Sequence, residues 1–175
     1  MWEIVVIVVV VVIAAVLIFA VTRPDMFGVE RSISIGAAPD RIFPLINDFK
    51  SWTSWSPYEK RDPAMKRTYS SQTSGKGAVY EWDGNSQVGK GRIEIIDASA
   101  PSRVTIKLDM IKPMEGHNIV NFTLEPRGGA TQLTWAMRGA SAYMTKLFGL
   151  FCDMDKMIGK DFEAGLANLK TLAER

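Results

Sequence analysis

The last stretch of the chain, from Asp153 to Ala173, alternates apolar and polar residues with a helical period. Its apolar side chains recur at steps of three or four residues and line one helix face: Met154, Met157, Ile158, Phe162, Leu166, Leu169 and Leu172. Asp153 is a candidate N-cap, because its carboxylate can accept hydrogen bonds from the free N–H groups of the first turn. Gly159 and Gly165 each cost about 1 kcal/mol relative to Ala inside a helix. We therefore expect another backbone or a ligand to approach closely there.

The first apolar stretch, Ile4 to Val21, contains no charged residue. As a helix it would span about 27 Å, close to the hydrocarbon thickness of a bilayer. We predict a transmembrane anchor in residues 1–22 and a linker in residues 23–26. A cleaved signal peptide is the alternative, but Met1-Trp2-Glu3 carries an acid and no base, which is atypical of a signal peptide.

Arginines follow the apolar stretch and none precedes it. Arg23, Arg31 and Arg41 come after Val21. The excess of Lys and Arg in cytoplasmic segments therefore predicts a single-pass protein of the inner (cytoplasmic) membrane, with its C-terminal domain facing the cytoplasm.

Residues 27–175 read mainly as strands. Period-two alternation predicts a first strand at Phe27–Gly36, and Ala38-Pro39-Asp40 opens a short helix, followed by a short turn at Asn47–Ser51. Asp83-Gly84-Asn85 and Gly128-Gly129 indicate tight hairpins. A further short helix is expected at Ala142–Phe151. The six later strands are predicted at Met65–Ser71, Gly77–Asp83, Gly89–Ala98, Arg103–Ile111, His117–Glu125 and Thr131–Arg138.

This order of elements predicts an α+β domain. Consecutive strands with short connections form an antiparallel meander. The only element long enough to cover a curved sheet of six to seven strands is the C-terminal helix. We expect this helix to lie inside the bent sheet without filling it.

Large aromatic and methionine side chains dominate the predicted inner faces. Such a lining suits a pocket for a hydrophobic molecule, whereas the plainer interpretation is that these side chains only fill a core. The segment from Trp52 to Tyr58 is expected to be a loop, either a lid over the cavity, a loop packed on the core or a contact with the bilayer interface. The predicted ligand-binding residues are Trp52, Trp55, Tyr80, Trp82, Met110, Phe122, Trp135, Met137, Met154, Met157, Ile158 and Phe162.

Charge and chemistry narrow the function classes. The net charge is +2 and acids are interleaved with bases, so no nucleic-acid surface is predicted. The chain has one Cys, Cys152, and one His, His117, which are too few ligands for a zinc site of the usual kind. His117 is expected to be solvated at a turn. No catalytic residue, metal or cofactor is predicted.

Several motifs together resemble the START-like (SRPBCC) superfamily of helix-grip proteins, often grouped with polyketide cyclases and dehydrases. The resemblance covers residues 27–175. It is carried by Val29–Ile35 with Ala38–Phe43, Asn47-Asp48-Phe49 with Trp52 and Trp55-Ser56-Pro57, Gly77–Trp82, Thr131–Trp135 and Gly159–Glu163 with Gly165-Leu166. It implies a hydrophobic ligand held between the sheet and the long helix.

Three functions follow from the resemblance and the anchor. The first is membrane-anchored binding of a hydrophobic small molecule or lipid. The second is an enzyme of cyclase or dehydratase type, with Tyr80 or a buried acid as proton donor, which would require Tyr80 or Asp109 to face the cavity beside another ionisable group. The third is an interaction module of a membrane complex, which a filled interior would favour.

Overall fold

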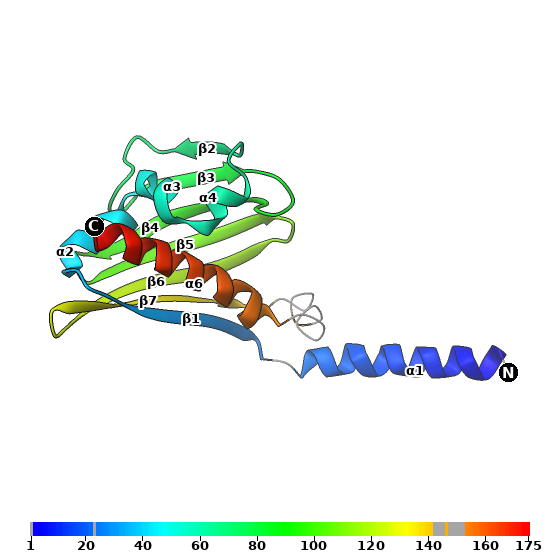
Figure 1. The fold of residues 1–175 in the computed structure, drawn as a ribbon. Coiled ribbons are helices and arrows are strands. Elements are labelled where there is room, and N and C mark those ends of the chain that lie inside the picture. The colour runs from blue at the N-terminus through cyan, green and yellow to red at the C-terminus, as the bar shows by residue number, and fades with distance from the viewer. Residues whose placement is uncertain (1, 23, 142–145, 147–152) are drawn as a thin grey trace.

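One antiparallel sheet of seven strands organises the domain in the computed structural model, which describes residues 2–22, 24–141, 146 and 153–175. The strands lie in the order β1-β7-β6-β5-β4-β3-β2, so the first strand closes onto the last (Figure 1). Their bounds are β1 Met26–Ile35, β2 Lys66–Tyr69, β3 Val79–Asp83, β4 Lys90–Ser99, β5 Arg103–Lys112, β6 Gly116–Arg127 and β7 Ala130–Ala140. The predicted α+β fold and its meander are confirmed.

The long C-terminal helix α6, Met154–Ala173, lies across the inner face of the curved sheet (Figure 1). Its N-cap is Asp153, whose carboxylate accepts a hydrogen bond from the Lys156 backbone N–H at 3.0 Å. Phe162, Leu166 and Leu169 are buried as the period predicts. Burial of each such side chain contributes about 1.5–3 kcal/mol, so this face fixes the helix on the sheet.

Short helices join β1 to β2 and differ from the expected loop. They are α2 Pro39–Asn47, the 3-10 turn η1 Phe49–Ser51, α3 Trp52–Trp55 and α4 Pro57–Arg61. The predicted loop at Trp52–Tyr58 is therefore wrong, because most of it forms α3 and the start of α4. Trp52 and Trp55 are buried, so this segment belongs to the core.

The two predicted tight turns have different outcomes. Gly128 and Gly129 both have positive φ, +56° and +86°, and form the two-residue turn between β6 and β7. The connection between β3 and β4 instead runs from Gly84 to Gly89, longer than the expected hairpin. The helix predicted at Ala142–Phe151 lies almost wholly outside the described residues.

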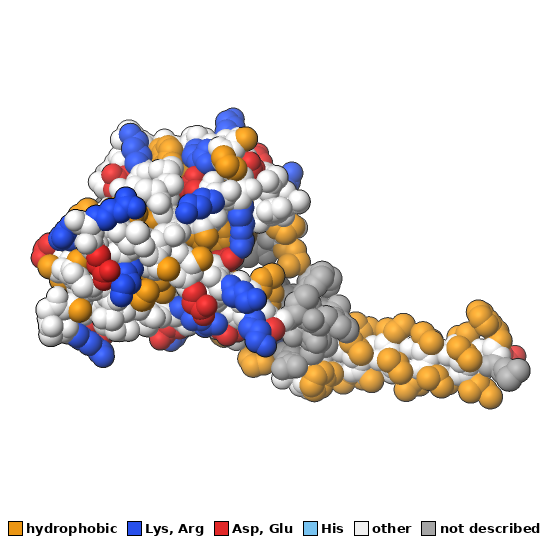
Figure 2. Space-filling view, viewed as in Figure 1, with side chains coloured by type: hydrophobic (Ala, Val, Ile, Leu, Met, Phe, Trp, Pro, Cys, Tyr) orange, Lys and Arg blue, Asp and Glu red, His pale blue; other side chains and the backbone are white. Residues whose placement is uncertain are grey.

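The N-terminal helix α1, Trp2–Val21, extends away from the domain, and of its residues Ala20 is the buried one (Figure 1). Figure 2 shows apolar side chains all along α1, whereas charged side chains of both signs cover the visible face of the domain. By length and composition α1 could cross a membrane, and a signal sequence would share these two features.

Candidate functional site

Aromatic rings fill the middle of the space between the sheet and α6. Trp135 of β7 stacks on Phe162 of α6, with ring centroids 4.1 Å apart and planes 9° from parallel. Trp55 meets Trp135 edge-on at 5.6 Å, and Phe122 lies 4.9 Å from Trp135. Trp52 continues the cluster at 4.9 Å from Trp55. The prediction that α6 lies inside the bent sheet without filling it is therefore wrong for the centre, which the protein's own side chains occupy.

The indole N–H groups of this cluster are not all satisfied. Trp52 donates to the Ile46 carbonyl at 2.9 Å, and Trp55 donates to the Leu45 carbonyl at 2.8 Å. The N–H of Trp135 is buried and has no hydrogen-bond partner among the described residues. A buried donor without a partner is destabilising by about 1–3 kcal/mol. The Trp135 N–H is therefore able to donate a hydrogen bond to the oxygen of a water or of a ligand.

The inner face of the sheet is less deeply buried at one end of the domain, where α6 begins and β5 ends. We call this the open end. Trp82, Leu108, Met110, Met154 and Ile158 are all half-buried there. Register pairs Trp82 of β3 with Gly91 of β4, and Gly91 with Met110 of β5, so Trp82 and Met110 lie in one row on either side of a glycine. An apolar molecule could extend this surface without displacing the central rings.

The twelve predicted ligand-binding residues divide between the packed centre and the open end. Buried in the centre are Trp52, Trp55, Tyr80, Phe122, Trp135, Met137 and Phe162. Half-buried towards the open end are Trp82, Met110, Met154 and Ile158, while Met157 is 55% exposed. The prediction omitted Leu108, although it follows Val104 and Ile106 on the same face of β5.

A carboxylate that the prediction missed lies on the buried side of α4. Glu59 is 6% exposed, accepts a hydrogen bond from the Tyr80 hydroxyl at 2.6 Å and pairs with the Arg67 Nε at 2.7 Å. Burial, and then the hydrogen bond to the Glu59 carboxylate, raise the pKa of Tyr80 far above its usual value. Tyr80 therefore stays protonated and acts as a donor. The Glu59-Lys60-Arg61-Asp62 run gave no hint, because mixed charge usually marks a solvated segment.

The single His lies on the outer face of the sheet. The His117 imidazole is 66% exposed at the start of β6, and its Nδ1 lies 2.6 Å from Asp109 Oδ1. Burial raises the pKa of Asp109, but hydrogen bonds from His117 and Lys107 outweigh it and hold that pKa below the usual value. Solvation of His117 is confirmed, and Asp109 points away from the inner face. Within the described ranges, no group of three His, Cys, Asp or Glu could hold a metal ion.

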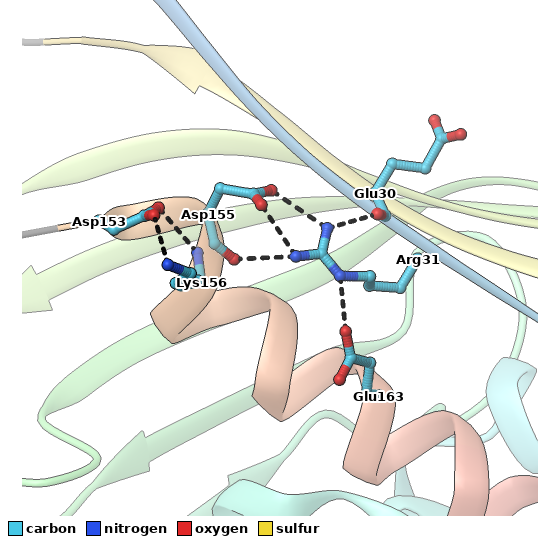
Figure 3. A network of polar contacts seen from close by, with 6 residues as sticks. All are labelled: Glu30, Arg31, Asp153, Asp155, Lys156 and Glu163. Atoms are coloured by element: carbon cyan, nitrogen blue, oxygen red, sulfur yellow. Dashed lines mark hydrogen bonds and ion pairs between the residues drawn. The ribbon is translucent and has the colours of Figure 1, made fainter.

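Ion pairs fasten the first turns of α6 to β1. The Arg31 guanidinium donates to Asp155 Oδ2 and to Glu163 Oε1, both at 2.9 Å, and also to the Asp155 carbonyl at 3.2 Å (Figure 3). These hydrogen bonds from Arg31 hold the pKa of Asp155 below its usual value. Arg31 lies on the inward-facing side of β1. The alternation of the strand predicted that position, but no partner was predicted for the side chain.

The two helical glycines give room to side chains. A Cβ on Gly159 would collide with the guanidinium group of Arg31. A Cβ on Gly165 would lie 2.7 Å from the Trp135 ring and 3.2 Å from Pro57. The close approach was predicted correctly, but the neighbours are side chains in place of a backbone or a ligand.

Two surface hollows lie close to the open end. One, of about 440 Å³, lies between the β3–β4 and β5–β6 connections and is lined by Gly84, Asn85, Ser86, Gly89, Lys112 and Pro113. The other, of about 430 Å³, lies beside the start of α6 and is lined by Arg61, Asp153, Lys156, Met157, Lys160 and Asp161. The first hollow combines two glycines and Pro113 with Asn85, Ser86 and Lys112, whereas charged side chains of both signs surround the second.

Solved structures with the same fold have low sequence identity to this chain. A protein of Chromobacterium violaceum shares 14% identity, with a TM-score of 0.61 over 87% of this chain and 99% of its own. The Aha1 dimer from Colwellia psychrerythraea shares 15%, with a TM-score of 0.57 over 85% and 96%. DynU16, from the dynemicin biosynthetic locus, shares 15%, with a TM-score of 0.58 over 85% of this chain and 47% of its own. These likenesses establish the fold.

The sequence itself identifies the family. No significant match was found among curated protein sequences. A family model described as "Polyketide cyclase / dehydrase and lipid transport" matches residues 26–174, which is nearly the whole domain beyond α1. The match agrees with the resemblance to START-like proteins and with the observed sheet wrapped around α6. The chain therefore belongs to the polyketide cyclase/dehydrase and lipid transport family.

Proposed function

We propose that this protein binds a hydrophobic small molecule or lipid at the open end of the space between the sheet and α6. The observation that carries the proposal is the set of half-buried apolar side chains there, Trp82, Leu108, Met110 and Ile158, in a domain of this family. Ligand pockets are usually apolar with few polar groups, and these side chains fit that description. The central rings then form the floor of the site.

We further propose that α1 anchors the domain in a membrane. Residues 1–22 form the anchor, residues 23–26 the linker and residues 27–175 the ligand-binding domain. Apart from Glu3 in its first turn, the helix contains no charged residue, and most of it is exposed. The arginines that follow it, Arg23, Arg31 and Arg41, favour a cytoplasmic domain at the inner membrane. The tether would keep the open end near ligands dissolved in the bilayer and so raise its encounter rate with them.

Lipid retention tests the binding proposal directly. The full chain, purified in mild detergent, is examined by native mass spectrometry for co-purified lipid. Met110→Glu places a charge at the open end and is expected to abolish retention, because burying a carboxylate beside an apolar ligand is unfavourable. Ile119→Glu on the outer face of the neighbouring strand is the matched control and is expected to retain lipid. Equal retention by both variants would contradict the proposed site.

A second candidate is an enzyme of cyclase or dehydratase type. The contact between Tyr80 and Glu59 favours it, because a buried phenol beside a carboxylate is a usable proton donor. Both Glu59 oxygens already accept hydrogen bonds from protein donors, which weakens this candidate. Turnover of a bound ligand by the natural chain, lost in Tyr80→Phe while lipid is retained, would establish an enzyme. Retention without chemical change would leave binding as the function.

A further inference from the structure

Exposed apolar side chains gather at the open end of the domain. Outside α1, the large apolar residues that the described structure leaves exposed are Met26 at 61%, Ile111 at 51%, Met114 at 42%, Ile119 at 39% and Met157 at 55%. Ile119 is a single residue on the outer face of β6. The other four belong to the start of β1, the end of β5, the β5–β6 turn and the first turns of α6.

Topology places these four segments at one end. Met26 pairs with Ala140 at the end of β7, and Met110 pairs with Gly116 across the β5–β6 turn. Figure 1 shows that turn, the start of α6 and the departure of α1 all at the same end of the domain. We call the group formed by Met26, residues 111–114 and Met157 the lip.

Lysines lie in the lip and beside it, on the side of the β3–β4 and β5–β6 connections. The hydrogen bond from Lys90, and then the nearby charges of Lys112 and Lys66, hold the pKa of the Asp83 carboxyl below its usual value. Only Lys90 is ion-paired with it, at 2.8 Å, among the described residues. Lys112 also lines the 440 Å³ hollow between the two hairpin connections. Lys66 and Lys112 thus remain available for a further anion, while the Glu115 carboxylate at the turn is solvated.

We propose that the lip docks on the surface of an anionic lipid bilayer. Met114, Ile111 and Met157 would enter the interfacial region, and Lys66 and Lys112 would meet headgroup phosphates. The proposal depends on the anchoring role of α1 proposed above. Only residues 22–25 separate α1 from β1, a reach of at most about 14 Å, so an inserted α1 keeps the lip beside the bilayer. Docking would also turn Met110 and Ile158 towards the source of a lipid ligand.

Labels at the two ends of the domain test the docking. In a Cys152→Ser background, the full chain is labelled with an environment-sensitive fluorophore at Met114→Cys or, at the opposite end, at Ser102→Cys. Each is reconstituted into nanodiscs of phosphatidylcholine alone or mixed with phosphatidylglycerol, with bromine on the acyl chains. We expect quenching at position 114 to exceed that at position 102 by at least about three-fold in the anionic discs, because only the lip reaches the interface.

Charge reversal tests the lysines. Lys66→Glu with Lys112→Glu should remove the extra quenching that phosphatidylglycerol causes at position 114, because the headgroup attraction is lost. Lys76→Glu, an exposed lysine near the start of β3, is the matched control and should leave the quenching unchanged. An unchanged lipid dependence in the double variant would overturn the role of the two lysines.

A carbonate wash of membranes separates this proposal from the anchor. If the chain is washed off, the proposed anchor fails. If the chain stays in the membrane and the label at position 114 is as exposed to water as the label at position 102 in both lipids, the docking is overturned while the anchor stands. A label at position 114 that is shielded from water without bromine quenching would indicate a protein contact, and would also overturn bilayer docking.

Discussion

Replacing Glu59 by Gln tests whether the buried carboxylate of α4 stabilises the domain through its charge. Glu59 has a side chain only 5% exposed, and Arg67 is 24% exposed. The two carboxylate oxygens of Glu59 accept hydrogen bonds from the Tyr80 hydroxyl at 2.6 Å and from the Arg67 Nε at 2.7 Å. Gln keeps the size, its amide oxygen can accept from Arg67 Nε and its amide N–H can donate to the Tyr80 hydroxyl oxygen, so the main change is the loss of the negative charge.

The magnitude follows from the two contacts. A hydrogen bond to a charged group contributes about 1.5–3 kcal/mol, and a neutral one about 0.5–1.5 kcal/mol. Arg67 is partly hydrated, which reduces the loss at that contact. We therefore expect Glu59→Gln to lower the free energy of unfolding by about 1–3 kcal/mol. Glu59→Ala should lower it by about 3–5 kcal/mol, because it leaves the partners of a buried charge unpaired.

Thermal unfolding of the full chain in mild detergent, followed by its intrinsic tryptophan fluorescence, measures the loss. A domain of this size loses about 2–4 °C of Tm for each kcal/mol. Asp97→Asn is the control, because the Asp97–Arg103 pair at 3.1 Å is about half exposed on both sides. Such exposed pairs contribute about 0–1 kcal/mol. Equal small shifts for Glu59→Gln and Asp97→Asn would refute the assignment of a stabilising charge to Glu59.

Three further variants test the packing and the ion pairs of α6. Phe162→Ala removes the ring stacked on Trp135 and should lower the free energy of unfolding by about 3–5 kcal/mol, measured by the same thermal assay; a loss below that of a surface substitution would contradict the packed centre. Gly165→Ala should lower it by about 1 kcal/mol, since overpacking against Trp135 by about 1–3 kcal/mol exceeds the gain in helix propensity of about 1 kcal/mol, and a stabilised variant would show that the ring moves. Asp155→Asn should be less stable than the natural chain at neutral pH. Because the Arg31 contact lowers the folded pKa of Asp155 below its usual value of 3.8, that difference should be complete above about pH 4 and vanish as the pH falls through the folded pKa. A difference that persists in acid would exclude this ion pair as its cause.

Local patterns were sufficient for most of the fold. Period-two alternation located every strand to within a few residues, and the period of α6 located its buried face and its cap at Asp153. The connections were less predictable. The segment Trp52–Tyr58 has the composition of a loop, but the indole N–H groups of Trp52 and Trp55 find carbonyl partners on α2 only after the chain has folded back.

For the candidate site, the sequence alone determined which residues face inward, because alternation along a strand and the helical period are properties of the local backbone. The sequence also determined the apolar length of α1. It predicted the close approach at Gly159 and Gly165 as well, because a glycine inside a helix is unfavourable unless a neighbour needs the space. Only the tertiary structure decided which inward residues fill the centre and which stay half-buried at the open end. It also brought Glu59 to Tyr80, and Arg31 to α6. These outcomes depend on distances between segments far apart in the chain, and no local pattern records the distance that remains between a sheet and a helix once their side chains are packed.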